Sequence, residues 1–173
     1  GRHLRGPRDL HLCSTMNMRL PILLLALLCQ PVVAERLDDS LSTQQQFDLD
    51  LDWKHTGNTD RLNERELNAL TAEVRYVEIR LNTAPYVGQQ GSIFLGLPID
   101  IRGSGDSTAL RMSWETNGLF SSGSVSAGNR AKIFEGEITD PVMTDVFSLT
   151  FDIDARQVYN TLRFQPVFEI EAF

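Results

Sequence analysis

Cysteine and histidine are scarce in this sequence, and most of them lie near its start. The 173 residues include two cysteines, Cys13 and Cys29, and three histidines, of which only His55 lies beyond position 30. A structural zinc site needs about four Cys or His ligands, so residues 35–173 cannot supply one. The same residues contain no thiol nucleophile and no disulfide. We therefore expect a domain that is held together by its hydrophobic core alone.

Sequence motifs for phosphate binding and serine hydrolysis are also missing. The chain contains no GxSxG, no GxGxxG and no GxxxxGK[ST] motif. Gly103, Gly105 and Asp106 belong to a glycine-rich stretch, but no lysine directly follows it, and a hairpin loop explains its composition better. We therefore predict no bound cofactor and no metal centre.

The longest apolar run is too short to cross a membrane. Leu20–Cys29 covers about half of the roughly 20 residues that a spanning helix needs. Arg19 precedes this run, and small residues ending at Ala34 follow it, which is the pattern of a cleaved secretory signal. We predict a signal peptide over residues 16–34. The basic residues 1–15 precede the first methionine, and we interpret them as an upstream, non-native leader.

The charge balance limits the partners that this protein can bind. The formal net charge is −7, and the predicted signal and leader carry more basic than acidic residues, so the remaining domain is still more acidic. An acidic surface repels nucleic acid and anionic lipid. We expect no nucleic-acid partner and no membrane span after signal cleavage. A protein or another cell-envelope component stays open as a partner, in the periplasm or outside the cell, and the oligomeric state stays open too.

Apolar and polar residues alternate with period two over most of residues 46–173, as in half-buried strands. Turn residues such as Asn117-Gly118 interrupt the alternation at intervals of about ten residues, which is typical of sandwiches and barrels. We predict a single all-β domain, an antiparallel β-sandwich that is immunoglobulin-like in broad form, with about seven to nine strands. Strands are expected at Phe47–Trp53, Val77–Leu81, Ser92–Ile101, Leu110–Glu115, Ala131–Ile138, Phe147–Asp154 and Leu162–Ile170.

Two segments do not follow this alternation. Residues Thr59–Ala72 are polar with leucines near helical spacing, which predicts a short helix or a crossover between sheets, capped by Thr59 or Asn58. Residues 35–45 are polar and favour a flexible N-terminus of the mature chain.

Three aspartates alternate with apolar residues in the sequence FDLDLDW. If this is one strand, Asp48, Asp50 and Asp52 share a face, with neighbours about 6.6 Å apart. The pattern resembles the start of an EF-hand, but Trp53 replaces the glycine and Thr59 replaces the final glutamate of that loop. We therefore interpret the three residues as a candidate face for a cation or a partner, or as a solvated, aggregation-blocking surface, without assigning a metal.

Five aromatic residues could provide a platform on which a sugar stacks. Trp53 and Trp114 are in phase with aliphatic neighbours, so we expect both in the core. Tyr86 and Tyr159 flank turns and are the better candidates for aromatic contacts with a ligand. Tyr76 completes the set.

The leading functional hypothesis is a non-catalytic binding or interaction module. One alternative is a small carboxylate-dependent hydrolase, because Glu135 and Glu137 have a spacing found in inverting glycosidases and His55 could serve as a base. A second alternative is a structural subunit of a surface fibre or envelope assembly, completed by a neighbour's strand.

Overall fold

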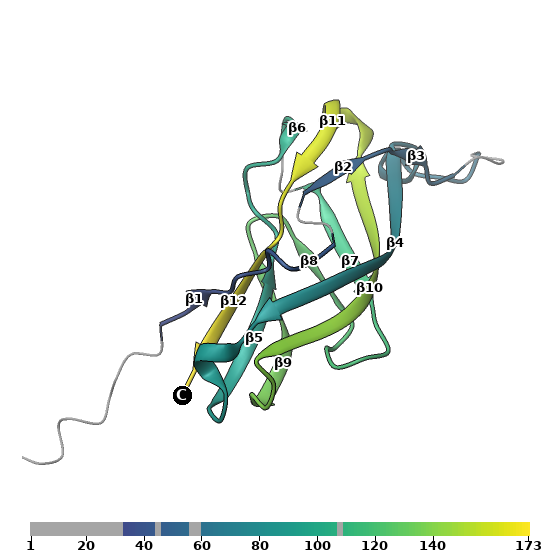
Figure 1. Cartoon of the computed structure of the whole chain (residues 1–173). Helices are drawn as coiled ribbons and strands as arrows, with labels where there is room; N and C mark the ends of the chain where they lie inside the picture. The colour runs from purple at the N-terminus through teal and green to yellow at the C-terminus, as the bar shows by residue number, and fades with distance from the viewer. Residues whose placement is uncertain (1–32, 44–45, 56–59, 107–108) are drawn as a thin grey trace, which may run out of the picture. The chain divides into compact units, whose positions relative to one another are not determined.

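The computed structural model describes residues 33–43, 46–55, 60–106 and 109–173 of the chain (Figure 1). These residues belong to one compact unit, Val32–Phe173. Strands dominate it, and in the described part no helix has the length and apolar character needed to cross a membrane. Almost all of the predicted signal peptide, the leader and the proposed helix caps Asn58 and Thr59 lie outside the described residues.

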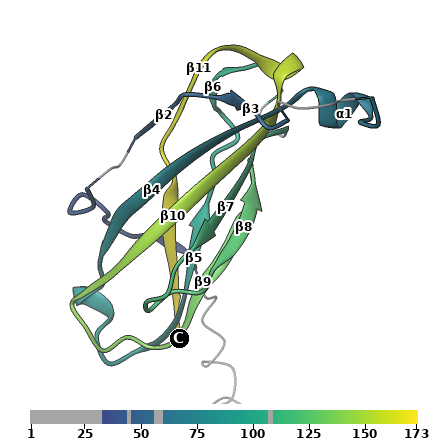
Figure 2. The same cartoon turned by 90° about the vertical axis from the view of Figure 1, so that its right-hand side faces the viewer.

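The described strands form three antiparallel sheets, and Figure 2 shows β4, β10, β7 and β8 side by side in one layer. The five-stranded sheet consists of β3 (Asp52–Trp53), β4 (Ala69–Asn82), β10 (Val142–Asp154), β7 (Arg111–Glu115) and β8 (Gly123–Ser126). The four-stranded sheet consists of β1 (Glu35–Arg36), β12 (Val167–Ala172), β5 (Gln90–Gly96) and β9 (Arg130–Glu137). The three-stranded sheet consists of β2 (Phe47–Leu49), β11 (Val158–Phe164) and β6 (Arg102–Ser104).

The core lies between the sheets and follows the period-two pattern of the sequence. In β10, Phe147 and Leu149 are buried whereas Ser148 is exposed. Side chains from all three sheets meet around a small interior void, and they include Phe47, Ile79, Leu95, Met112, Phe147 and Phe168. The predicted all-β, sandwich-like fold is confirmed.

The number of strands differs from the prediction because several strands are very short. Seven strands have five or more residues, which agrees with the expected seven to nine. The other five contain two to four residues each, and alternation cannot be recognised over so few positions. They bring the total in the described residues to twelve.

The segment Thr59–Ala72, which is predicted to form a short helix or a crossover between sheets, contains a helix of about one turn. Helix α1 spans Glu64–Leu67. Asn63 caps it, because its side-chain oxygen accepts a hydrogen bond from the N–H of Glu66 at 3.0 Å, and the Glu66 carboxylate accepts one from the N–H of Asn63 at 2.9 Å. Strand β4 begins at Ala69 because the chain there pairs with β10, and this tertiary pairing overrides the local leucine spacing.

The N-terminal residues are attached to the sheets, where the sequence favours a flexible segment. Strand β1 pairs with β12, and Leu37 is buried in the core. Ser42 and Thr43 bind the edge of β4, because each hydroxyl accepts a hydrogen bond from a backbone N–H of that strand and donates one to the same residue's carbonyl. The buried Leu37 and the hydrogen-bonded hydroxyls of Ser42 and Thr43 hold this segment in place, although its composition is otherwise polar.

Candidate functional site

The three aspartates of the FDLDLDW run do not form one acidic face. Asp48 lies on β2, which pairs with β11, whereas Asp52 lies on β3, which pairs with β4 in another sheet. Asp50 is in the connection between them. Phe47 anchors β2 in the core, because it is buried between Phe151 and Phe164 with its ring stacked on that of Phe164 at 5.7 Å between centroids, and the chain changes sheets after Leu49. This corrects the prediction of a single strand face.

Asp48 also has a structural partner. Arg163 Nε donates a hydrogen bond to its carboxylate at 2.6 Å, and this hydrogen bond lowers the pKa of Asp48. Within the described residues, no group of three or more histidine, cysteine, aspartate or glutamate side chains is arranged to hold a metal ion.

The two tryptophans have opposite environments. Trp114 is 2% exposed, as predicted, and its indole N–H donates a hydrogen bond to the carbonyl of Ser121 at 2.8 Å. Trp53 is 54% exposed, which corrects the prediction that it belongs to the core. Trp53 lies on the two-residue edge strand β3, which belongs to a different sheet from Leu49. The inward and outward alternation that buries Leu49 therefore does not extend to Trp53.

The predicted aromatic contacts Tyr86 and Tyr159 do not share a surface. Tyr86 lies just after the C-terminal end of β4. Tyr159 lies near the opposite end of β4, because it follows the end of β10, where Asp154 pairs with Ala69. The length of β4, roughly 40 Å, therefore separates them. Tyr86 is half-buried, and burial together with a hydrogen bond to Glu35 raises its pKa to about 12. Tyr159 is 77% exposed.

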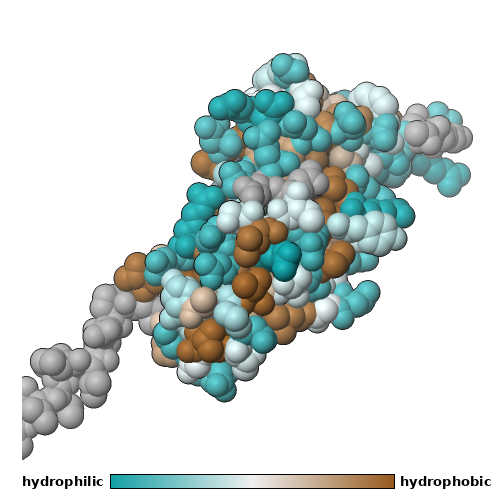
Figure 3. Space-filling view, in the orientation of Figure 1, coloured by the Kyte–Doolittle hydropathy of each residue, from teal (hydrophilic) through white to brown (hydrophobic). Residues whose placement is uncertain are grey.

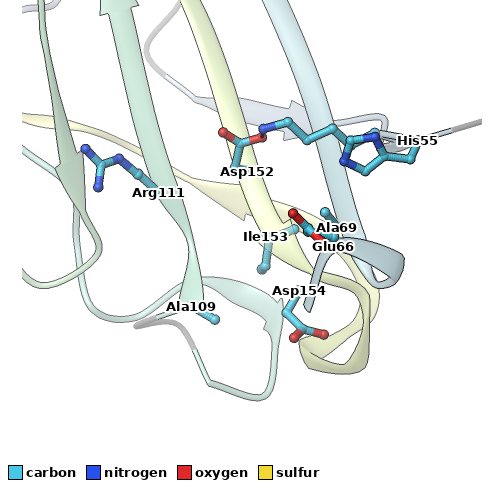
Figure 4. A pocket seen from close by; sticks show the side chains of 9 residues that line it. His55, Glu66, Ala69, Ala109, Arg111, Asp152, Ile153 and Asp154 are labelled. Carbon is cyan, nitrogen blue, oxygen red and sulfur yellow. Dashed lines mark hydrogen bonds and ion pairs between the residues drawn. The ribbon is translucent and has the colours of Figure 1, made fainter. Parts of the chain in front are cut away.

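A cleft of about 500 Å³ lies at the end of the five-stranded sheet, and we call it the end cleft (Figure 4). Asp152 and Asp154 project from β10 and Arg111 from β7, while His55 follows β3. The lining is completed by Lys54, Glu66, Ala69, Ala109 and Ile153.

The carboxylates of the end cleft have structural partners. Lys54 Nζ is 2.9 Å from Asp152 Oδ1, and Arg156 Nη2 is 2.6 Å from Asp154 Oδ2. Glu66 belongs to the capping box of α1. His55 is exposed and is the one histidine among the described residues that line the cleft. No serine or cysteine of the described chain lines the cleft with it. The geometry therefore brings charges together without assembling a nucleophile, a base and an orienting acid.

A second depression lies on the outward face of the five-stranded sheet, and we call it the outer-face hollow. Its volume is about 380 Å³, and it spans β4, β10 and β7. Most of the residues that line it are hydroxylic, charged or aromatic, and the aliphatic Leu149 completes the lining beside Glu73, Arg75, Tyr76, Ser113, Trp114, Glu115, Ser148 and Thr150. All of its lining residues are described.

Tyr76 borders this hollow in an unusual backbone conformation. The pairing of β4 with β10 shifts register between Phe147 and Leu149, where two residues of β4 stand opposite one of β10. At this bulge Tyr76 has a φ of 60°, and the other described residues with positive φ are glycines. The Tyr76 side chain is 82% exposed. A bulky residue is disfavoured at such a φ, so the bulge directs a large aromatic ring into solvent at an energetic cost.

The floor of the outer-face hollow consists of hydroxyl groups that the described protein leaves unbonded. The hydroxyls of Ser113, Ser148 and Thr150 make no hydrogen bond to another described residue. Thr150 lies between Glu73 and Ser113 in the register, and Ser148 lies opposite Glu115. Arg75 Nη2 is 2.7 Å from Glu73 Oε2. The sequence names Tyr76 as one of five possible platform residues but does not single it out, because a positive φ at a tyrosine leaves no sequence signal.

Glu135 and Glu137 lie away from both depressions. They are exposed on the edge strand β9, and Glu135 forms an ion pair with Lys132. Neither lines the end cleft or the outer-face hollow.

No protein-family model, no curated protein and no solved structure matches this chain.

Proposed function

We propose that this protein is an exported bacterial β-sandwich module that binds a partner without catalysing a reaction, in the periplasm or at the cell exterior. The observation that carries the proposal is Tyr76, which the bulge in β4 holds exposed at a φ of 60° beside hydroxyls that have no hydrogen-bond partner among the described residues. Backbone strain at an exposed aromatic side chain has no role in packing, and strained residues cluster at functional sites.

The charged groups support binding over hydrolysis. Asp152 and Asp154 in the end cleft each pair with a cation, and Glu135 on β9 pairs with Lys132. A hydrolase acid or base has to contact its substrate, and each of these carboxylates already contacts a cationic side chain.

The position of β1 supports the proposed export. Strand β1 begins at Glu35, directly after the proposed cleavage site at Ala34. Cleavage there keeps every strand of the described fold, including the pairing of Glu35 with Ile170.

The binding role is tested by co-sedimentation of the purified chain, from Glu35 onward, with delipidated cell envelopes of a Gram-negative host. We expect the protein to be retained and Tyr76→Gly to be released, because glycine adopts the same φ without strain and lacks the ring. Phe173→Gly is the matched control, because it removes an aromatic side chain that is 66% exposed and does not line the outer-face hollow. Equal retention of the Tyr76→Gly variant contradicts the proposed binding surface.

The non-catalytic role is tested separately with a panel of ester and glycoside substrates. We expect no turnover. Hydrolysis that disappears in His55→Ala or Glu135→Gln overturns the proposal in favour of the carboxylate-dependent hydrolase.

A further inference from the structure

The outer-face hollow has the chemical composition of a sugar-binding surface. We infer that it binds a neutral oligosaccharide, with the ring of Tyr76 stacked on the apolar face of a pyranose; this inference rests on the proposed binding function. Sugars combine a dense array of hydroxyls with faces of C–H groups, so a site for them needs polar groups and an exposed aromatic ring together. The hollow provides both.

The polar groups of the hollow are arranged in two rows across neighbouring strands. One row contains Glu73, Thr150 and Ser113, and the next contains Ser148 and Glu115. Adjacent strands are about 4.8 Å apart and successive rows about 7 Å apart, so donors and acceptors are spread over an area of pyranose dimensions. The small serine and threonine side chains leave the floor low, while Tyr76 rises at one side on β4.

The groups in these rows are available to a ligand. The hydroxyls of Ser113, Ser148 and Thr150 have no hydrogen-bond partner among the described residues, and each can donate and accept. Glu115 forms no ion pair with a described residue, so its carboxylate can accept hydrogen bonds from sugar hydroxyls. Arg75, which pairs with Glu73, adds donors at the same side of the hollow as Tyr76.

Other classes of ligand fit the hollow less well. The carboxylates of Glu73 and Glu115 would repel a phosphate or an acidic sugar, because these ligands are also negatively charged. An extended peptide that adds a strand needs a free sheet edge, whereas β10 in the middle of the hollow already pairs with β4 and β7. An apolar ligand would contact the exposed ring of Tyr76 but would also cover the hydroxyls of Ser113, Ser148 and Thr150. On the face displayed in Figure 3, hydrophobic residues form small groups separated by hydrophilic ones.

The inference is tested by NMR titration of the isotope-labelled chain, from Glu35 onward, with cellotetraose, xylotetraose, maltotetraose and chitotetraose, each to about 10 mM. We expect at least one of them to shift the amide signals of Ser113 and Ser148. Tyr76→Gly and Tyr76→Ala should weaken that binding about tenfold or more, and Tyr76→Phe should retain it. Phe173→Gly, which removes an exposed aromatic ring outside the hollow, should leave the affinity unchanged.

The Tyr76→Gly variant separates loss of binding from loss of folding. Because glycine relieves the positive φ, its unfolding midpoint should equal or exceed that of the unchanged protein. Absence of shifts at the hollow with all four oligosaccharides overturns the inference, as does unchanged binding by Tyr76→Gly. If the same variants abolish envelope co-sedimentation while no oligosaccharide binds, the sugar assignment fails and the proposed binding function stands. If neither assay depends on Tyr76, both fail.

Discussion

The carboxylate of Asp145 accepts a hydrogen bond from the backbone N–H of Phe120 at 2.8 Å, and this contact fixes the loop between β7 and β8. The same carboxylate accepts a second hydrogen bond from the Thr116 hydroxyl at 2.7 Å. Asp145 is buried in β10, and a Cβ atom on Gly118 would collide with it. An acidic side chain on the inward face of a strand thus has a structural role as the internal support of a hairpin loop.

Replacing Asp145 with alanine should lower the free energy of unfolding by about 3 kcal/mol, because one buried donor and one partly buried donor lose their carboxylate acceptor. Chemical denaturation followed by tryptophan fluorescence measures this change. Asp140→Ala is the control: Asp140 is exposed and accepts a hydrogen bond from the neighbouring Thr139, so the free energy should change by no more than about 0.5 kcal/mol. Equal unfolding midpoints for the two variants contradict the supporting role of Asp145.

The two tryptophans allow a matched test of the core. Trp114 is buried and stacks on Phe147 at 6.4 Å between ring centroids, so Trp114→Ala should cost about 3–5 kcal/mol of unfolding free energy. Trp53→Ala removes an exposed ring and should cost about 0.5 kcal/mol or less. Thermal and denaturant unfolding of both variants measure the difference. A stable Trp114→Ala protein would show that the indole contributes little to packing.

Alternation in the sequence predicted the fold well where strands are long and poorly where they are short. The phase of Leu110, Met112 and Trp114 correctly placed all three in the core, because β7 keeps one face inward along its length. The same reasoning failed for Trp53, because the chain leaves β2 after Leu49 and enters another sheet at β3. The pairing of a strand depends on residues that are distant in the sequence, so the local pattern around Trp53 does not reveal which sheet it joins.

The site was harder to predict than the fold for a physical reason. Sequence patterns identified turns, and so favoured Tyr86 and Tyr159, which flank them. Tyr76 lies inside β4, where it looks like an ordinary strand residue, and its exposure results from a bulge against β10. The bulge arises from the register of two strands that are far apart in the sequence, so it becomes visible when the pairing is known.

Export predicts a defined N-terminus. If the signal over residues 16–34 is removed, the intact mass of protein from a periplasmic extract should correspond to a chain that starts at Glu35. Arg19, the apolar run Leu20–Cys29 and the small residue Ala34 are the basis of this expectation. A protein found in the membrane pellet with Met16 or Met18 retained contradicts it.

The raised pKa of Tyr86 predicts a loss of stability at high pH. Burial and the hydrogen bond to Glu35 raise this pKa from 10.0 to about 12, so the folded state holds the phenol proton more tightly than the unfolded state. The resulting stabilisation is complete below about pH 10 and is lost as the pH rises towards about 12. Tyr86→Phe lacks this titration. The unfolding midpoint of the unchanged protein should therefore fall relative to that of Tyr86→Phe across this pH range, and parallel profiles would contradict the assignment.

Calcium should not stabilise the protein more than magnesium does, although three aspartates alternate in one short run. A calcium site gathers six to eight oxygen ligands around one ion, whereas Asp48 and Asp52 lie on strands of different sheets. Arg163 already occupies the carboxylate of Asp48, and its hydrogen bond lowers the pKa of that group, so an ion would have to displace a bound cation. Specific binding to the folded state would raise the melting temperature with ion concentration by mass action. Thermal melts in millimolar calcium and in millimolar magnesium should therefore coincide. A rise in melting temperature that is specific to calcium and that Asp50→Asn removes would show that the acidic run is a cation site after all.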